Sequence, residues 1–272
     1  MVQPQDWDER GKGVKNDRLD ALALCQRLDR YARGNQKAFS IVRMPTEEEE
    51  RERALSRQRQ QLVRERQRMA AMGRSLLAMH GIHVTGKWWK GKTWSLIRAQ
   101  APGWVQERLQ VFIALIVPVA AQEVKLTEAL QEAGQQRKLP RGVGPLTFEV
   151  LRREVGDWSR FHNRRQVSSY TGLCPREHSS GGKRRAGSVS KSGNPRVRAM
   201  LVEMVWRMMR WQPDYQPLLK WSAVLKDPAR SAAQRKKAVV AIARQLAVVL
   251  WRLFTGQTEA EKLGLTYLPE AA

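Results

Sequence analysis

The segment at 176–198, REHSSGGKRRAGSVSKSGNPRVR, places two serines among many cations. Ser179 and Ser180 stand beside glycines, and the segment has seven Lys or Arg residues against one acid, Glu177. A serine hydroxyl can attack a phosphodiester when cations stabilise the developing charge and a base, here His178 or a carboxylate, takes the proton. Alternatively, the segment is a flexible basic loop that holds a phosphate backbone without chemistry, or a solvated loop without a partner. The residues expected to contact nucleic acid are Lys183, Arg184, Arg185, Lys191, Asn194, Arg196 and Arg198.

A pair of acids, Asp17 and Asp20, lies three residues apart at the start of a predicted helix. Carboxylates at this spacing fall on one helix face and can share a hard cation such as Mg²⁺, as nuclease sites require. Aspartate is also common in the first turn of a helix, because it caps the helix and complements its dipole. The pair alone therefore leaves both interpretations open.

A glycine-rich turn precedes another helix in LPRGVGPLTFEVL, at 139–151. Gly142 and Gly144 flank one apolar residue, and Pro145 follows at the expected first helical position. This pattern is typical of a helix-hairpin-helix turn, in which backbone N–H groups hold a phosphate. An ordinary glycine turn between two helices has the same pattern.

Aromatic and basic residues alternate in KWWKGKTW, at 87–94. Trp88 and Trp89 stand among three lysines, and such a mixture can stack on unpaired bases. The alternative is a hydrophobic plug beneath a loop. Both interpretations expect a loop or hairpin here, because glycines at 81, 86 and 91 interrupt the helical pattern.

Helical periodicity predicts the elements that must position these motifs. Helices are expected at 16–33, from a Thr46–Glu49 capping box to about 80, from 103 to about 137, from Pro145 onward, at 195–211 and at 231–255. The charged second half of the helix at 103–137 is typical of a solvated helix or a coiled-coil arm. A short extended piece is expected at 37–45, and the change of texture after 136 indicates a domain boundary.

The overall charge favours a polyanionic partner. The chain has 49 Lys or Arg and 26 Asp or Glu, a formal charge of +23, so nucleic acid is the leading partner, with an acidic substrate or an anionic membrane second. Two cysteines and four scattered histidines predict neither a disulfide framework nor a zinc site. The apolar run at 111–121 is too short to cross a membrane, so no membrane contact and a cytoplasmic location are expected.

In this order along the chain, the motifs resemble the transposases of the IS110 family of insertion sequences, which includes the IS1111 branch. The resemblance begins at KNDRLDA, residues 15–21, and covers nearly the whole chain. Its most specific part runs from Gly142 to Arg198, where G-x-G, E-x-GD-x-x-RF, Q-x-x-x-Y-x-GL-x-P, S-G and SK-x-GN follow one another at the family's spacing.

This resemblance implies a RuvC-like (RNase H-like) domain that binds Mg²⁺ through a DEDD set of acids, and a transposase domain with a catalytic serine. Asp17 and Asp20 match the last two acids, and Ser180 matches the nucleophile, with Ser179 as the alternative if the register differs by one residue. The family also implies double-stranded DNA (element ends and target) and a structured guide RNA, the bridge RNA, as partners. It further implies homo-oligomers, with dimers pairing into tetramers.

We therefore expect a mainly α chain with a partial α/β element. The expected parts are an incomplete RuvC-like domain with a basic helical extension (1–98), a helical coiled-coil linker (99–136) and a transposase domain with a helix-hairpin-helix-like turn and the serine loop (137–272). The first two acids of the DEDD set are missing, so we expect N-terminal truncation and poor Mg²⁺ binding.

The expected function is RNA-guided DNA cleavage and rejoining through a phosphoserine intermediate, impaired by the truncation. One alternative is a non-catalytic module that binds DNA or RNA. The other is an assembly partner that joins a full-length transposase through the helix at 105–137.

Overall fold

The structure is a computed structural model that describes residues 16–39, 43–135, 139–177 and 186–267. The chain divides into two compact units, residues 1–50 and 51–272. The domain boundaries expected after 98 and after 136 stay predictions.

The described part of the first unit consists of α1 (Asp17–Ala32), a 3₁₀ helix (Gln36–Ala38) and the start of α2 (Glu47–Met79). The Asn16 side chain caps α1, because its Oδ1 accepts a hydrogen bond from the Arg18 N–H at 2.9 Å. α1 buries none of its residues within this structure. Its exposed leucines are Leu19, Leu22, Leu24 and Leu28. The prediction of an extended piece at 37–45 is wrong at its start, because residues 36–38 form a 3₁₀ helix. Residues 40–42 of this piece lie outside the described residues.

α2 begins at the predicted capping box. The Glu49 N–H donates to Thr46 Oγ1 at 3.2 Å, and the Thr46 N–H donates to Glu49 Oε2 at 3.0 Å. Each side chain therefore satisfies a backbone donor that the helix start leaves without a partner. The helix then continues to Met79, close to the predicted end.

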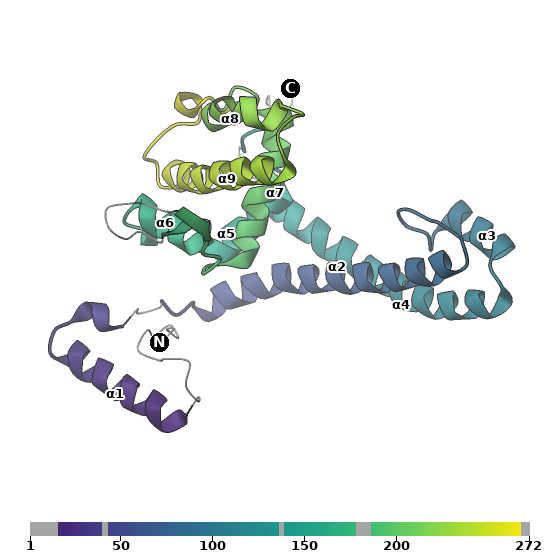
Figure 1. Cartoon of the computed structure of the whole chain (residues 1–272), viewed down its shortest axis with the longest axis horizontal. Coiled ribbons are helices and arrows are strands. Elements are labelled where there is room, and N and C mark those ends of the chain that lie inside the picture. The colour runs from purple at the N-terminus through teal and green to yellow at the C-terminus, as the bar shows by residue number, and fades with distance from the viewer. Residues whose placement is uncertain (1–15, 40–42, 136–138, 178–185, 268–272) are drawn as a thin grey trace. The chain divides into compact units, whose positions relative to one another are not determined.

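In the second unit, α2 and α4 (Gly103–Gln135) form an antiparallel arm with α3 (Gly91–Gln100) at its far end (Figure 1). Arg66 on α2 pairs with Glu123 on α4, with 2.6 Å between Nε and Oε2. Arg59 Nε donates to Thr127 Oγ1, also at 2.6 Å. The charged half of α4 that suggested a solvated or coiled-coil helix therefore pairs with α2.

A separate apolar core at the far end of the arm contains the two tryptophans predicted to contact nucleic acid. Trp88 is 0% exposed and Trp89 is 5% exposed. The Trp88 indole Nε1 donates to the Ala70 carbonyl oxygen at 3.0 Å, and its ring lies directly against Gly73. A buried ring cannot stack on a base, so the stacking interpretation of Trp88 and Trp89 is wrong, and they form the hydrophobic plug instead.

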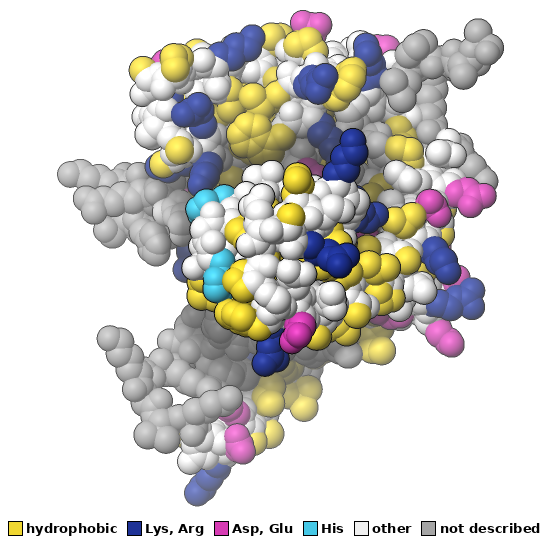
Figure 2. Space-filling view, turned by 90° about the vertical axis from the view of Figure 1, so that its right-hand side faces the viewer, with side chains coloured by type: hydrophobic (Ala, Val, Ile, Leu, Met, Phe, Trp, Pro, Cys, Tyr) yellow, Lys and Arg dark blue, Asp and Glu magenta, His cyan; other side chains and the backbone are white. Residues whose placement is uncertain are grey.

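Among the described helices, α4 is the one long and apolar enough to cross a membrane. An 18-residue window has a mean hydropathy of 1.6, and 11% of it is buried. Its exposed apolar residues include Trp104, Val111 and Leu115. Figure 2, which looks from the α3 side of Figure 1, shows hydrophobic side chains between scattered Lys and Arg. The apolar helical segment is thus longer than the run at 111–121, and the expectation that this region is too short to cross a membrane was wrong. Length and composition alone do not place α4 in a membrane.

The remainder of the second unit is a helical bundle in which α9 (Ala232–Phe254) packs against α6, α7 and α8. The other helices are α5 (Pro145–Val155), α6 (Arg164–Thr171), α7 (Pro195–Trp211) and α8 (Gln216–Lys226), with 3₁₀ turns at Trp158–Arg160 and Glu261–Leu263. Leu201 and Met204 on α7 and Ile242 and Leu246 on α9 are fully buried in its core. The mainly α prediction is confirmed, and α7 has the predicted bounds.

One two-stranded sheet occurs among the described residues. β1 (Pro175–Glu177) pairs antiparallel with β2 (Ala186–Val189), with Pro175 opposite Val189 and Glu177 opposite Ala186. In the described stretches of 1–98 the chain forms helices, turns and irregular segments, without a strand. The RuvC-like remnant stays a prediction.

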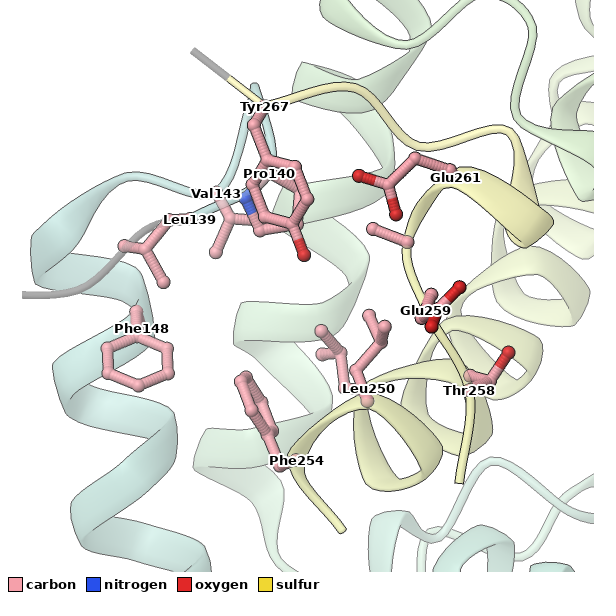
Figure 3. A pocket seen from close by; sticks show the side chains of 12 residues that line it. Leu139, Pro140, Val143, Phe148, Leu250, Phe254, Thr258, Glu259, Glu261 and Tyr267 are labelled. Atoms are coloured by element: carbon pink, nitrogen blue, oxygen red, sulfur yellow. The ribbon is translucent and has the colours of Figure 1, made fainter. Parts of the chain in front are cut away.

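The end of the described chain returns to the glycine-rich turn, where Tyr267 and Pro140 form an isolated antiparallel bridge. Beside this bridge lies a hollow of about 470 Å³ with mostly apolar walls that include Phe148 and Phe254. Glu259 and Glu261 lie on one side of it (Figure 3). Because these two carboxylates repel anions, the hollow does not suit a phosphate.

Candidate nucleic-acid interface

The β1–β2 hairpin flanks residues 178–185, which we name the serine segment. Residues 178–185, with Ser179, Ser180, Lys183, Arg184 and Arg185, lie outside the described residues. Beyond the strands the two flanks stay joined, because the Ser190 N–H donates to the Cys174 carbonyl at 2.8 Å and the Asn194 N–H donates to the Tyr170 carbonyl at 2.8 Å. Gly193 permits this approach, since a Cβ there would lie 2.5 Å from the Tyr170 oxygen.

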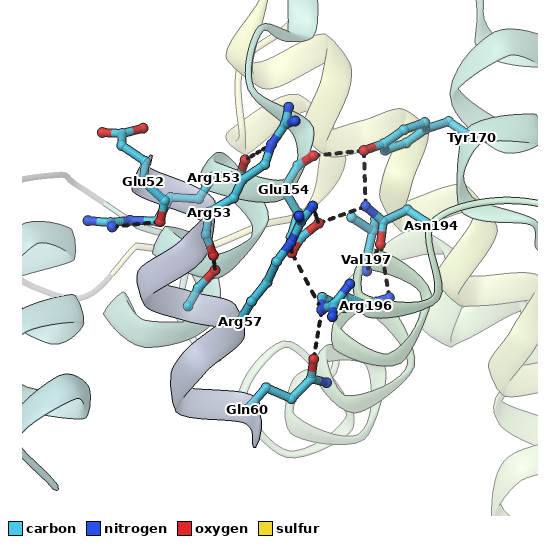
Figure 4. A network of polar contacts seen from close by, with 11 residues as sticks. Glu52, Arg53, Arg57, Gln60, Arg153, Glu154, Tyr170, Asn194, Arg196 and Val197 are labelled. Carbon is cyan, nitrogen blue, oxygen red and sulfur yellow. Dashed lines mark hydrogen bonds and ion pairs between the residues drawn. The ribbon is translucent and has the colours of Figure 1, made fainter. Parts of the chain in front are cut away.

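Three motif residues far apart in the sequence meet in one polar network (Figure 4). The Glu154 side chain is 0% exposed and accepts hydrogen bonds from Arg57 Nε at 3.1 Å and Asn194 Nδ2 at 2.9 Å. Arg196 Nε lies 3.6 Å from the same carboxylate. The Tyr170 hydroxyl donates to the Glu154 carbonyl at 2.7 Å and accepts from Asn194 Nδ2 at 3.2 Å. This network connects α2 to both flanks of the serine segment.

Three side chains predicted to contact nucleic acid form hydrogen bonds to other residues of the chain, namely Asn194, Arg196 and Arg198. Besides contacting Glu154, Asn194 caps α7 by accepting from the backbone N–H groups of residues 196 and 197 at 2.9 and 3.2 Å. Arg196 Nε donates to the Gln60 amide oxygen at 2.8 Å. Arg198 Nη1 donates to two backbone carbonyls at 3.1 and 3.2 Å. Lys191 is different, because it is exposed and adopts a φ of 58°, a left-handed turn conformation that is uncommon for lysine.

A groove of about 770 Å³ lies beside β1, and arginines dominate its walls. All three residues of β1 line it, including Glu177, the one acid among the described lining residues. We name it the arginine groove, after Arg164, Arg165, Arg176, Arg244 and Arg252. Among the described residues, the four arginines from α6 and α9 form no ion pair with a carboxylate. Cations without an internal counter-charge attract a polyanion such as a phosphate backbone.

Two helices supply the arginines that sequence reasoning missed. Arg164 and Arg165 are the first two residues of α6, whose positive dipole end adds to their charge. Arg244 and Arg252 are eight residues apart on α9, so they lie on one helix face. That spacing is visible in the sequence, but α9 is otherwise so apolar that the sequence alone indicated no more than a helix at 231–255.

The glycine-rich turn has the local geometry that its sequence requires. Gly142 adopts a φ of +86°, which favours glycine, and Gly144 occupies the N-cap position of α5 directly before Pro145. The helix-hairpin-helix interpretation itself stays a prediction, because an ordinary helix connection has the same local features.

The two acids predicted to bind metal lie in the first turn of α1. Asp17 is exposed and Asp20 is half-buried. Among the described residues, no group of three or more His, Cys, Asp or Glu side chains is placed to hold a metal ion. Mg²⁺ in proteins is often held by one or two carboxylates together with waters and phosphate oxygens, so the Mg²⁺ site at Asp17 and Asp20 stays a prediction.

Comparison with known proteins identifies the class as transposase. The family described as "Transposase IS116/IS110/IS902 family" matches residues 139–220, which contain the hairpin and, of the Glu154 network, Glu154, Tyr170, Asn194 and Arg196 but not Arg57. The protein y4rJ of Sinorhizobium fredii, named as a transposase, is 30% identical over 274 residues, which cover 92% of this chain and 68% of that protein. The chain therefore belongs to the IS116/IS110/IS902 family of insertion-sequence transposases.

Two further relatives carry similar names. The transposase for insertion sequence element IS1111A of Coxiella burnetii is 28% identical over 268 residues, covering 94% of this chain and 71% of the relative. A protein of Pseudomonas aeruginosa named as a family 20 transposase is 27% identical, covering 95% of this chain and 77% of the relative. The similarity thus extends well beyond the matched family segment.

Proposed function

We propose that this chain cleaves and rejoins DNA through a covalent phosphoserine bond at Ser180, with Ser179 as the alternative nucleophile. The observation that carries the proposal is the arginine groove, because all of β1 lines it and β1 leads directly into the serine segment. Membership of a transposase family supports DNA as the substrate. The groove would hold the strand near the scissile phosphate.

The proposed step is a transesterification. The serine Oγ forms a bond to phosphorus while the bond between phosphorus and the leaving strand oxygen breaks. A base takes the serine proton, and the leaving oxygen gains a proton. One phosphorus–oxygen ester bond replaces another, so the strand can be rejoined by the reverse attack without an external energy source. The arginines would stabilise the negative charge that develops on the phosphate oxygens.

The resemblance to the family extends the proposal to guidance by a structured RNA and to a homo-oligomeric assembly, dimer or tetramer. Mg²⁺ stays a prediction that rests on the family resemblance. The groove supports either nucleic acid, because arginine contacts to phosphates do not depend on base sequence.

The decisive experiment measures a covalent adduct. The chain is incubated with fluorescent DNA carrying the element end and with RNA transcribed from the flanking non-coding sequence, and the products are separated in denaturing gels. The intact chain should give a DNA-labelled protein band, Ser180→Ala should abolish it, and Ser179→Ala should retain it. The reverse result for the two serines would assign Ser179.

Three other outcomes would contradict the proposal. An adduct that survives both serine substitutions would exclude the serine mechanism. DNA or RNA binding without an adduct would favour the non-catalytic binding module, and restoration of activity only with a longer relative would favour the assembly partner.

A further inference from the structure

A second hollow, which we name the α5 pocket, lies where α2, α5 and α7 meet. Its volume is about 190 Å³. The polar residues that matter in its lining are Ser56, Arg59, Gln60, Thr147, Arg196 and Arg207. Pockets that hold small organic ligands usually measure roughly 300–1,000 Å³, so this one suits a single compact group.

Three guanidinium groups from two helices converge on the α5 pocket, and Glu203 is the one acid among its described lining residues. Arg207 contacts this acid, with 3.3 Å between Nη2 and Oε1. Arg59 instead donates to the neutral Thr127 hydroxyl. Arg196 and Arg57 both contact the Glu154 carboxylate, so the single negative charge of Glu154 faces two positive charges. The pocket therefore has an excess of positive charge.

Burial increases the cost of this excess. Desolvation lowers the pKa of Arg59 below its ordinary value, although the nearby acids Glu123 and Glu203 act in the opposite direction. Glu123 is itself paired with Arg66. An anion that enters the pocket would offset the cost of removing these guanidinium groups from water.

The start of α5 adds hydrogen-bonding groups of the required kind. Thr147 is 5% exposed, and its Oγ1 accepts from Arg207 Nη1 at 3.3 Å, which leaves the hydroxyl proton available for an anion. The first turn of α5 also presents the positive end of the helix dipole.

From this geometry we propose that the α5 pocket binds one phosphodiester group of a nucleic-acid backbone, held by Arg59 from α2 and Arg207 from α7. The site is separate from the arginine groove, since the two share no lining residue. The inference rests on the proposed nucleic-acid binding, but it does not depend on the serine reaction.

A double-mutant cycle on the full chain tests this site. Arg59→Gln, Arg207→Gln and the double variant are made in a Ser180→Ala background, so that no covalent step contributes. Binding of fluorescein-labelled duplex DNA is measured by anisotropy over a series of KCl concentrations, and a labelled RNA hairpin forms the second arm. Thermal unfolding verifies that each variant is folded.

If one phosphate accepts both arginines, each single substitution should weaken binding about three- to tenfold and reduce the salt slope by about 0.9. The double variant should be little worse than either single variant, because both remove the same contact. Coupling with only one of the two nucleic acids, the duplex DNA or the RNA hairpin, identifies that nucleic acid as the source of the phosphate. The proposal would be overturned if the two substitutions had additive effects on the binding of both nucleic acids, or if the salt slopes did not change.

Arg64→Gln is the matched control, because Arg64 is an exposed arginine on α2 that does not line the pocket. It should combine additively with Arg59→Gln. If Arg59→Gln does not fold, the cycle is repeated with Arg59→Lys and Arg207→Lys, which keep the charge but lose the forked donors. Additivity in that cycle would also overturn the proposal. Absence of a serine adduct would contradict the proposed function and leave these binding results unaffected.

Discussion

The buried carboxylate of Glu154 accepts a hydrogen bond from Asn194 Nδ2 at 2.9 Å, although the two residues are 40 positions apart. Glu154 lies in the last turn of α5, the helix that follows the glycine-rich turn, and Asn194 is the N-cap of α7, the helix that follows the serine segment. Their contact therefore places the start of α7, and with it one flank of the serine segment, against α5. The acid is the centre of this arrangement, since Arg57 and Arg196 also approach it.

Glu154→Gln should destabilise the chain by about 2 kcal/mol, because it leaves two arginines without their carboxylate while preserving the side-chain shape. Urea unfolding followed by circular dichroism measures the change. Glu65→Gln, which removes an exposed pair with Arg68, is the control and should cost less than about 0.5 kcal/mol. Equal effects of the two substitutions would argue against a central role for Glu154.

Gly73→Ala should destabilise the arm by about 1–3 kcal/mol, because the added Cβ would collide with the buried Trp88 ring. Thermal unfolding followed by tryptophan fluorescence reports on this region. Gly103→Ala is the matched control, since no atom lies within 4 Å of its added Cβ. If Gly73→Ala were as stable as Gly103→Ala, Trp88 would not pack as described.

Arg244→Gln should weaken binding of duplex DNA about threefold to tenfold and lower the dependence of affinity on salt, as expected when one phosphate contact is lost. Arg244 is half-buried in the wall of the arginine groove. Arg230→Gln serves as the control, because Arg230 is paired with Asp227 and lies outside the groove. Equal losses would mean that only overall charge matters. Filter binding at several salt concentrations distinguishes these cases.

The loss of folding stability at acidic pH should depend on Glu149. Burial raises the pKa of this carboxyl, but hydrogen bonds from Arg152 and Arg153 more than reverse the effect, so its pKa lies below the ordinary 4.5. A carboxyl with a lowered folded-state pKa stabilises the protein above its unfolded-state value, and this contribution is lost as the pH falls through the folded-state value.

The urea midpoint of the natural chain should therefore decrease as the pH falls from about 5 to about 3, and Glu149→Gln should show a shallower decrease over the same window. Glu65→Gln, which changes an exposed acid, is the matched control variant. Identical slopes for Glu149→Gln and the natural chain would show that Glu149 is not protonated differently in the folded and unfolded states.

Local patterns predicted α1, α2, α4, α5, α7 and α9, because their signals are carried by neighbouring residues, but α3, α6 and α8 were not predicted. The Thr46–Glu49 capping box and the bounds of α7 depend on contacts within one or two turns. The hairpin beside the serine segment was not predicted, since its strands are three and four residues long and lack an alternating apolar pattern.

By itself, the sequence determined the mainly helical fold, the positive charge and the family resemblance, because composition, periodicity and motif spacing are properties of the chain alone. Only the tertiary structure decided that Trp88 is buried and that Asn194 holds Glu154. It also brought Arg164 and Arg244 into one groove, and Arg59 and Arg207 into one pocket. These outcomes depend on which helix faces meet, and contacts between residues 40 or more positions apart have no signal in local spacing.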